Sequence, residues 1–129
     1  MHTKNADCLF CTVPFEQVIG ENRWAFAIWD AFPVTPYHAL IIPKRHIADY
    51  SNLNALEIRD CHELLTQVKR EVEKRDARVD GFNIGVNIGR SAGQTIFHCH
   101  IHLIPRRKGD VLNPKGGVRH VVPGQGFYE

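Results

Sequence analysis

The stretch that decides the fold is residues 93–107, which read GQTIFHCHIHLIPRR and place His98, His100 and His102 at every second position. Alternate side chains of a β-strand point to the same face of a sheet. The three imidazoles would then share one face, and Cys99 and Ile101 would point to the other. On a helix the same spacing would spread the rings around the axis. The pattern therefore predicts a strand whose histidine face looks into a functional site.

A metal ion held by all three histidines fits this geometry poorly. A rise of about 3.3 Å per residue places the outer two Cα atoms about 13 Å apart, whereas metal–nitrogen bonds are only about 2.0–2.1 Å long. One or two of the rings can bind a metal with ligands from elsewhere, which leaves nucleophilic or acid–base chemistry for at least one. A half-exposed strand that happens to use histidine is the bland alternative, but three histidines in register rarely arise by chance.

Length and charge limit the class of protein. The 129 residues suit one domain. A formal net charge of +2 is too small to argue for a nucleic-acid or membrane partner. No apolar run approaches the roughly 20 residues that span a membrane, and the N-terminal MHTKNADC lacks the apolar core of a signal peptide. We therefore expect a cytoplasmic protein.

Hydrophobic periodicity predicts one long helix among several strands. The helix is expected over 54–77, where Asn54 and Glu57 form a capping-box pattern. A hairpin is expected from 16–20 and 23–30, with its turn at 20–22. Further strands are expected over 37–43, 81–89 and the histidine stretch, followed by a loop after Pro105 and one short strand in the tail 118–129. This order predicts an α+β fold with an antiparallel sheet.

The four cysteines divide into two kinds. Cys61 lies on the apolar stripe of the expected helix and Cys99 on the core face of the histidine strand, so both are expected to be small buried residues. Cys8 and Cys11 form a C-x-x-C pair, which supplies two ligands of a tetrahedral zinc site. A thioredoxin-like redox pair would need a βαβ context that is absent around residue 8. The interpretation of Cys8 and Cys11 as a reduced pair without a functional role stays open.

The histidine run, HCHIHLI over 98–104, resembles the signature H-φ-H-φ-H-φ-φ of the histidine triad (HIT) superfamily, in which φ is apolar. FAIWDAFPVTPYHALIIPKRH over 26–46 and GVNIGRSAGQTIF over 85–97 resemble further segments of the same family, in the same order. The resemblance covers about residues 8–108, leaving 109–129 as a tail. It implies an α+β fold whose five-stranded antiparallel sheet joins that of a second chain in a homodimer with a ten-stranded sheet.

The resemblance implies that His100 is the nucleophile. It would attack the α-phosphate of a nucleotide and form a covalent nucleotidyl-histidine. Water would then hydrolyse this intermediate and release the nucleoside monophosphate. His98 and His102 would stabilise charge or protonate the leaving group, and His38 would support the catalytic histidine. Without the family, His38 would be a core histidine, Asp30 a loop cap and Asn87 a turn residue. The implied nucleotide-binding residues are Asp30, Ala31, Asn87, Gly93, Gln94, Thr95, His100 and His102.

A bacterial-type branch of the family carries a structural zinc, and its ligand pattern is complete in this sequence. The ligands would be the C-x-x-C pair, the histidine after I-P-K-x, and the first histidine of the triad. These positions are Cys8, Cys11, His46 and His98. The zinc would tie the N-terminus to the sheet and would not act as the Lewis acid of the reaction. No organic cofactor is implied.

The function expected from the resemblance is a hydrolase of dinucleoside polyphosphates such as diadenosine tetraphosphate, with weak base specificity. Arg106, Arg107 and Lys108 would meet the polyphosphate, although a solvated basic loop explains them equally well. A phosphoramidate hydrolase and a phosphorylase or nucleotidyltransferase would use the same intermediate. The tail has Phe127 and Tyr128 but lacks the tryptophan-bearing end of the phosphoramidase branch, which leaves the subclass open. Alternatives of another kind are a non-catalytic nucleotide-binding or zinc-organised interaction module, and a metal-dependent enzyme with its ion on the triad.

Overall fold

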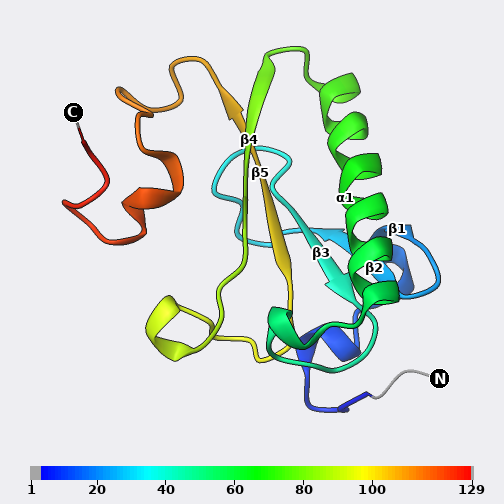
Figure 1. Cartoon of the computed structure of the whole chain (residues 1–129). Coiled ribbons are helices and arrows are strands. Elements are labelled where there is room, and N and C mark those ends of the chain that lie inside the picture. Colours follow the sequence, from blue (N-terminus) through cyan, green and yellow to red (C-terminus); the bar gives the residue numbers. More distant parts are fainter. Residues whose placement is uncertain (1–3, 129) are drawn as a thin grey trace.

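The computed structural model describes residues 4–128, in which five strands form one antiparallel sheet with the order β1-β2-β3-β5-β4. The strands are β1 (Val18–Glu21), β2 (Ala25–Trp29), β3 (Ala39–Pro43), β4 (Val79–Gly85) and β5 (Ile101–Arg107). One long helix, α1 (Ala55–Arg75), connects β3 to β4 and lies along one face of the sheet (Figure 1). The short 3₁₀ helices described are η1 (Leu9–Cys11), η2 (Phe15–Gln17), η3 (Tyr50–Asn52), η4 (Arg90–Ala92) and η5 (Gly117–Val121). The α+β prediction is confirmed.

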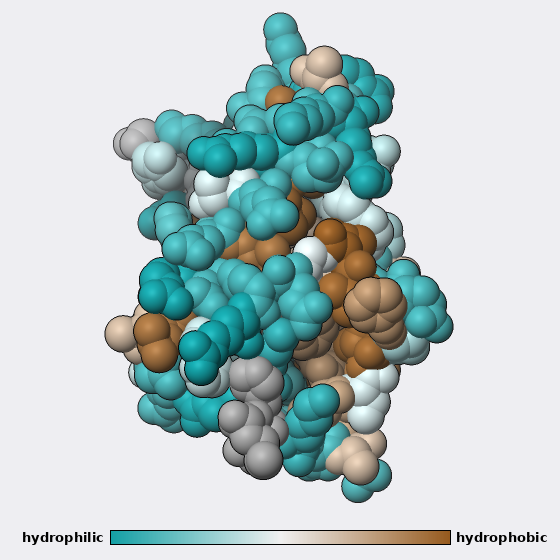
Figure 2. Space-filling view, turned by 90° about the vertical axis from the view of Figure 1, so that its right-hand side faces the viewer, coloured by the Kyte–Doolittle hydropathy of each residue, from teal (hydrophilic) through white to brown (hydrophobic). Residues whose placement is uncertain are grey.

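The helix α1 forms where the periodicity predicts it, and its N-terminus is capped as expected. The Asn54 side chain accepts a hydrogen bond from the backbone of Glu57, whose carboxylate accepts one from the backbone of Asn54. The buried stripe of α1 packs against small side chains of the sheet, including Ala25 and Ala27, which allow a close approach. Figure 2 shows the side of the molecule that carries α1, where hydrophilic side chains predominate around an apolar band.

The two faces of the sheet have different partners. On the α1 face, Ile101 and Leu103 of β5 are buried together with Cys61 of the helix. Cys99 is also fully buried, and burial raises the pKa of both cysteine thiols to about 12, so they behave as the small apolar residues that the sequence predicts. The opposite face, which we call the open face, carries a second apolar cluster in which Phe10 of η1 covers β2 and β3. His102 stands opposite Leu40 of this cluster, so it lies on the open face.

The predicted histidine strand is only partly correct. The strand β5 begins at Ile101, so His102 alone of the three histidines lies in it. The preceding segment leaves the ladder because the Cys99 N–H donates to the carbonyl of Ile47, in the loop after β3, at 2.6 Å. The strand also runs past Pro105, where a loop is predicted. Because β3 pairs with β5 only as far as Leu103, one side of β5 is open at Pro105 and a missing N–H is tolerated there.

Three other boundaries differ from the prediction. Glu21 stays in β1, so the hairpin turn lies at 22–24. The strand β4 spans Val79–Gly85, which leaves Asn87 in the loop after it. The prediction of a short strand in the tail is wrong, since Gly117–Val121 form the 3₁₀ helix η5 instead. None of the helices described is long and apolar enough to cross a membrane. The homodimer stays a prediction, with β1 and β4 as the edges of the sheet.

Candidate functional site

Three imidazoles form a row on the open face of the sheet. The rings of His100 and His102 have centroids 5.1 Å apart. His38, which immediately precedes β3, is buried, and its Nε2 lies 2.9 Å from Nδ1 of His102. The shared face predicted for His100 and His102 is therefore present. The His98 side chain instead turns toward the two N-terminal cysteines.

A chain of hydrogen bonds sets the tautomers of this row. The backbone N–H of Val34 donates to Nδ1 of His38 at 3.0 Å, so the proton of the neutral His38 ring must sit on Nε2. This Nε2–H donates to Nδ1 of His102. The remaining proton of the neutral His102 ring is then on its Nε2. His102 is thereby prepared as a hydrogen-bond donor.

His100 has the opposite arrangement. Its Nδ1–H donates to the backbone carbonyl of His98 at 2.8 Å, which leaves the lone pair on Nε2. Phe10 packs against the His100 ring edge-on, with centroids 5.0 Å apart. A neutral imidazole held in this tautomer has a nucleophilic nitrogen, as attack on phosphorus requires.

Burial controls the charge of the supporting histidines. It lowers the pKa of His102 to about 4, and the neighbouring His100 and His38 act in the same direction while Asp30 opposes them. Burial also lowers the pKa of His38, again against the effect of Asp30. Both rings are therefore neutral near pH 7, which is the state that the hydrogen-bond chain requires.

Asp30 has the loop-cap role and also faces His38, while its nucleotide-binding role stays a prediction. One carboxylate oxygen accepts the backbone N–H of Phe32 at 2.8 Å, as a loop cap does, and the other lies 3.4 Å from Nε2 of His38. Asp30, His38 and His102 place potential ligand atoms within 4.8 Å of one another. A metal on His38 Nε2 would need the ring proton on Nδ1, where the Val34 N–H donates. The His38 tautomer therefore argues against a metal ion bound to its Nε2 on the open face.

The loop between β4 and β5 uses its glutamine internally. Gln94 is buried, its Oε1 accepts the Gly89 N–H, and its Nε2 donates to the carbonyls of Ala48 and Ile96. Thr95 is exposed and lines a separate depression beside Cys8. Ala31 is exposed next to Asp30, and Gly93 adopts a φ of 94°. Direct phosphate contacts from these residues stay predictions.

A cleft of about 560 Å³ adjoins the histidine row, within the range of about 300–1,000 Å³ that is usual for small-molecule sites. His38, His102 and Asn87 line its polar end. The opposite wall comes from η5 in the C-terminal tail, through Gly117, Val118, His120 and Val121. Sequence reasoning missed this wall. The glycine pair 116–117 marks a turn, but nothing in the sequence shows that the turn folds back over β4.

The basic run after the triad is largely neutralised. Arg106 donates two hydrogen bonds to the carboxylate of Asp110, each at 2.8 Å, and one to Asn83 at 2.7 Å. Arg107 donates to Asp76 at 2.9 Å and to the carbonyl of Pro36. Lys108 is exposed. Arg106 and Arg107 therefore use these donors within the chain and do not form the solvated basic loop considered as the alternative, and a polyphosphate contact from this run stays a prediction.

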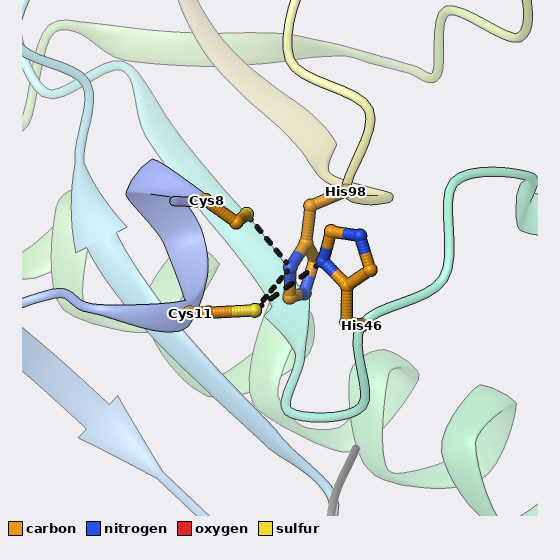
Figure 3. Close-up of side chains that lie close together, drawn as sticks. All are labelled: Cys8, Cys11, His46 and His98. Carbon is orange, nitrogen blue, oxygen red and sulfur yellow. Dashed lines mark hydrogen bonds between the residues drawn. The ribbon is translucent and has the colours of Figure 1, made fainter. Parts of the chain in front are cut away.

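The four predicted zinc ligands converge from three separate segments of the chain (Figure 3). Their potential ligand atoms all lie within 4.8 Å of one another. Cys8 Sγ lies 3.4 Å from Nδ1 of His98, and Cys11 Sγ lies 3.3 Å from Nδ1 of His46. A tetrahedral zinc with bonds of about 2.3 Å to sulfur and 2.0–2.1 Å to nitrogen separates such ligands by about 3.5 Å. The spacing of the group therefore fits zinc.

The tautomer of His98 also fits a metal ligand. Its Nε2–H donates to the backbone carbonyl of Pro43 at 2.7 Å, so Nδ1 presents its lone pair to the cysteines. Metal-bound histidines commonly donate their second ring N–H to a carbonyl in this way. The loop that carries His46 is fixed from the other side, because Arg45 binds both carboxylate oxygens of the buried Glu57 at 2.8 Å. The sequence indicates the capping role of Glu57 but not this ion pair.

The HIT domain family model matches residues 13–109. The chain belongs to the HIT family. An "Uncharacterized 16.1 kDa HIT-like protein" of Mycoplasma pneumoniae is 37% identical over 106 residues, which cover 79% of this chain and 73% of the relative. A zinc-bound histidine triad family protein from Mycobacterium smegmatis superposes with a TM-score of 0.73 at 33% identity, covering 83% of this chain and 80% of its own.

Two further HIT relatives have names that state an activity. An AP-4-A phosphorylase of Mycobacterium tuberculosis is 33% identical over 72% of this chain and 48% of its own length. An asymmetrical bis(5'-nucleosyl)-tetraphosphatase of Schizosaccharomyces pombe is 34% identical over 73% of this chain and 51% of its own. The chain thus spans about half of each of these relatives. Their shared region places this protein among HIT proteins that include enzymes of dinucleoside tetraphosphates.

Proposed function

We propose that this protein is a nucleotide hydrolase that cleaves dinucleoside polyphosphates at the α-phosphate through a covalent nucleotidyl-His100. The observation that carries the proposal is the fixed tautomer of His100, whose Nδ1–H donates to the carbonyl of His98 and leaves Nε2 as a nucleophile. The activities stated for the two tetraphosphate-related relatives support the substrate class.

The reaction then proceeds in two displacements. The Nε2 lone pair of His100 forms an N–P bond to the α-phosphorus while the bond from phosphorus to the bridging oxygen breaks. This bridging oxygen stays on the departing nucleotide and becomes part of its terminal phosphate. Water next attacks the same phosphorus, the N–P bond breaks, and its electron pair returns to Nε2 as nucleoside monophosphate is released. Two easier steps replace one difficult step.

The neighbouring residues stabilise charge in this scheme. His102 donates its Nε2–H to a non-bridging oxygen, because phosphoryl transfer depends mainly on positioning and on charge stabilisation there. His38 holds His102 in the donating tautomer. The Asp30 oxygen that faces His38 is available to a ribose hydroxyl, and Asn87, which lines the cleft, is available to phosphate.

The second part of the proposal is a structural zinc on Cys8, Cys11, His46 and His98. The fit of the donor spacing and of the His98 tautomer supports it, as does the zinc-bound neighbour. When bound, the ion would cross-link η1 and the His46 loop to the start of the triad. It would supply no Lewis-acid chemistry, because its ligand set of two sulfurs and two nitrogens is already complete for a tetrahedral ion.

The decisive test is mass spectrometry of the intact protein after brief mixing with diadenosine tetraphosphate and a mild quench. We expect an adduct of one nucleotidyl mass in the wild type and none in His100→Ala. His62→Ala, which changes an exposed histidine of α1, is the matched control and should form the adduct normally. Turnover that survives His100→Ala would overturn the nucleophile assignment. Binding without turnover would favour a nucleotide-binding module.

The same assay separates a hydrolase from a phosphorylase. If water is the acceptor, the product from the covalent intermediate is AMP whether or not inorganic phosphate is present. If phosphate is the acceptor, added phosphate shifts this product to ADP. The proposal predicts AMP under both conditions.

A further inference from the structure

The cleft beyond His102 has apolar walls. On the sheet side they are formed by Val34 and Ile104 together with the polar Asn83, and on the tail side by Val118 and Val121 together with His120. Among the described residues that line the cleft there is no Lys, Arg, Asp or Glu. Arg106 is bound to Asp110 and to Asn83 of the lining, and Arg119, next to Val118, donates to the carbonyl of Gly126. Such a cleft is a poor place for a run of phosphates and a suitable place for an uncharged ring system.

The tail wall is held in place by its own contacts. The Nε2–H of His120 donates to the carbonyl of Lys115 at 2.7 Å, and Phe127 packs edge-on against the His120 ring at 4.5 Å. Arg119 donates to the carbonyl of Gly126, and a side chain at Gly126 would collide with the ring of His120. The wall is therefore a folded part of the site, and Val118 and Val121 are presented from a defined turn.

A second depression lies beside Phe10. It has a volume of about 290 Å³, and its lining combines apolar side chains with charged ones: Phe10, Val13, Phe15, Val18 and Phe26 together with Lys4, Cys11, Glu21 and Lys44. Phe10 connects the two regions, since its ring also packs against His100. One depression therefore adjoins His102 and the other adjoins Phe10, which packs against His100, and a substrate with two nucleosides joined by a phosphate chain needs two such regions.

Building on the proposed function, we propose that the cleft between the sheet and Val118–Val121 binds the distal nucleoside of a dinucleoside polyphosphate, the one that departs with the leaving group. The phosphate chain would run past His102 and Asn87 at the polar end of the cleft. The tail would then select dinucleotides over nucleotides that end in a free phosphate. This selection would come from the tail and not from Arg106 and Arg107, which are paired within the chain.

The test compares two ligands that differ only in this nucleoside, diadenosine tetraphosphate and adenosine 5′-tetraphosphate. Their Kd values are measured by calorimetry in a His100→Ala background, so that binding is read without turnover. Adding Val118→Ser and Val121→Ser should weaken the dinucleotide about tenfold or more, since each lost apolar contact is worth about that much. Affinity for adenosine tetraphosphate should stay unchanged. Val122→Ser, an exposed neighbour that does not line the cleft, is the matched control.

The outcomes separate this inference from the proposed function. Equal weakening of both ligands, or no change for either, would overturn the role of the cleft. Equal affinity of the two ligands before the valines are changed would overturn it as well. Absence of wild-type turnover would refute the proposed function while the Kd comparison still decides the inference. If His100→Ala loses its circular dichroism spectrum, KM values of the wild-type background replace the Kd values.

Discussion

The Nδ1 atom of His100 lies 2.8 Å from the backbone carbonyl oxygen of His98, whose own imidazole turns to Cys8 and Cys11. One residue therefore serves two sites. Its side chain belongs to the proposed metal-ligand group, and its backbone carbonyl fixes the tautomer of His100, the proposed nucleophile. If both proposals hold, the metal site is linked to catalysis through the position of this one short segment, although the metal would not contact the reacting atoms.

This linkage predicts that His98→Ala loses both zinc and activity. Without the side chain the ligand group is incomplete, and the segment that aligns His100 loses its anchor to Pro43 and to the cysteines. We expect less than one zinc per chain by elemental analysis, a lower Tm, and a fall in kcat of about tenfold or more.

His46 provides the comparison for this prediction. His46→Ala should lose zinc and Tm in the same way, with a smaller loss of kcat, because the backbone of His46 does not contact His100. His46→Cys keeps a zinc ligand and should restore metal content. Full activity of metal-free His98→Ala would contradict the linkage.

A second prediction concerns the ion pair between Arg45 and Glu57. Glu57 is fully buried and also caps α1, so Glu57→Gln leaves the guanidinium that fixes the His46 loop without its charge partner. Breaking one side of a fully buried pair costs about 3–5 kcal/mol, but the Arg45 side chain is 35% exposed, so the cost here is about 1–3 kcal/mol. We expect a loss of this order in the free energy of unfolding by urea. Glu63→Gln, on the exposed side of the same helix, should change it by less than about 0.5 kcal/mol.

The sequence predicts those features that depend on local patterns. The helical spacing of apolar residues locates α1 within two residues at either end, and the alternation of histidines places His100 and His102 on one face. The ligand set at Cys8, Cys11, His46 and His98 follows from the resemblance, and its members do converge.

The features that the sequence does not predict depend on contacts between distant segments. The strand β5 starts late because Cys99 bonds to Ile47, more than 50 positions away. Arg107 pairs with Asp76, which follows the end of α1 and lies 31 positions earlier in the chain. The wall formed by η5 arises from packing of the tail against β4. Periodicity carries no information on such pairings.

A third prediction tests the tautomer chain. His38→Leu removes the donor to Nδ1 of His102, so the His102 proton is no longer confined to Nε2 and kcat should fall about tenfold or more, with little change in KM. In His38→Gln the side-chain amide can still donate to Nδ1 of His102 and should recover much of the rate. If both variants lost only stability and kept kcat, His38 would be a core residue without a positioning role.

The last prediction follows from the pKa of His102, which burial lowers to about 4. In the unfolded chain His102 binds a proton with the ordinary histidine pKa of about 6.5, whereas in the folded protein burial disfavours this protonation. Between these values the unfolded state holds more protons, so stability is complete above about pH 6.5 and falls as the pH drops toward 4. At pH 5 the loss from this group is about 2 kcal/mol relative to pH 7.5.

The measurement is the free energy of unfolding in urea at pH 7.5 and at pH 5, for the wild type and for His102→Gln. Loss of zinc at low pH affects both proteins and cancels in the comparison. The wild type should lose about 2 kcal/mol more than His102→Gln between the two pH values. His62→Gln, in which an exposed histidine of α1 is replaced, should follow the wild type. Equal losses in the wild type and His102→Gln would show that His102 accepts a proton as readily in the folded protein as in the unfolded chain, and the neutral donor assigned to it would be wrong.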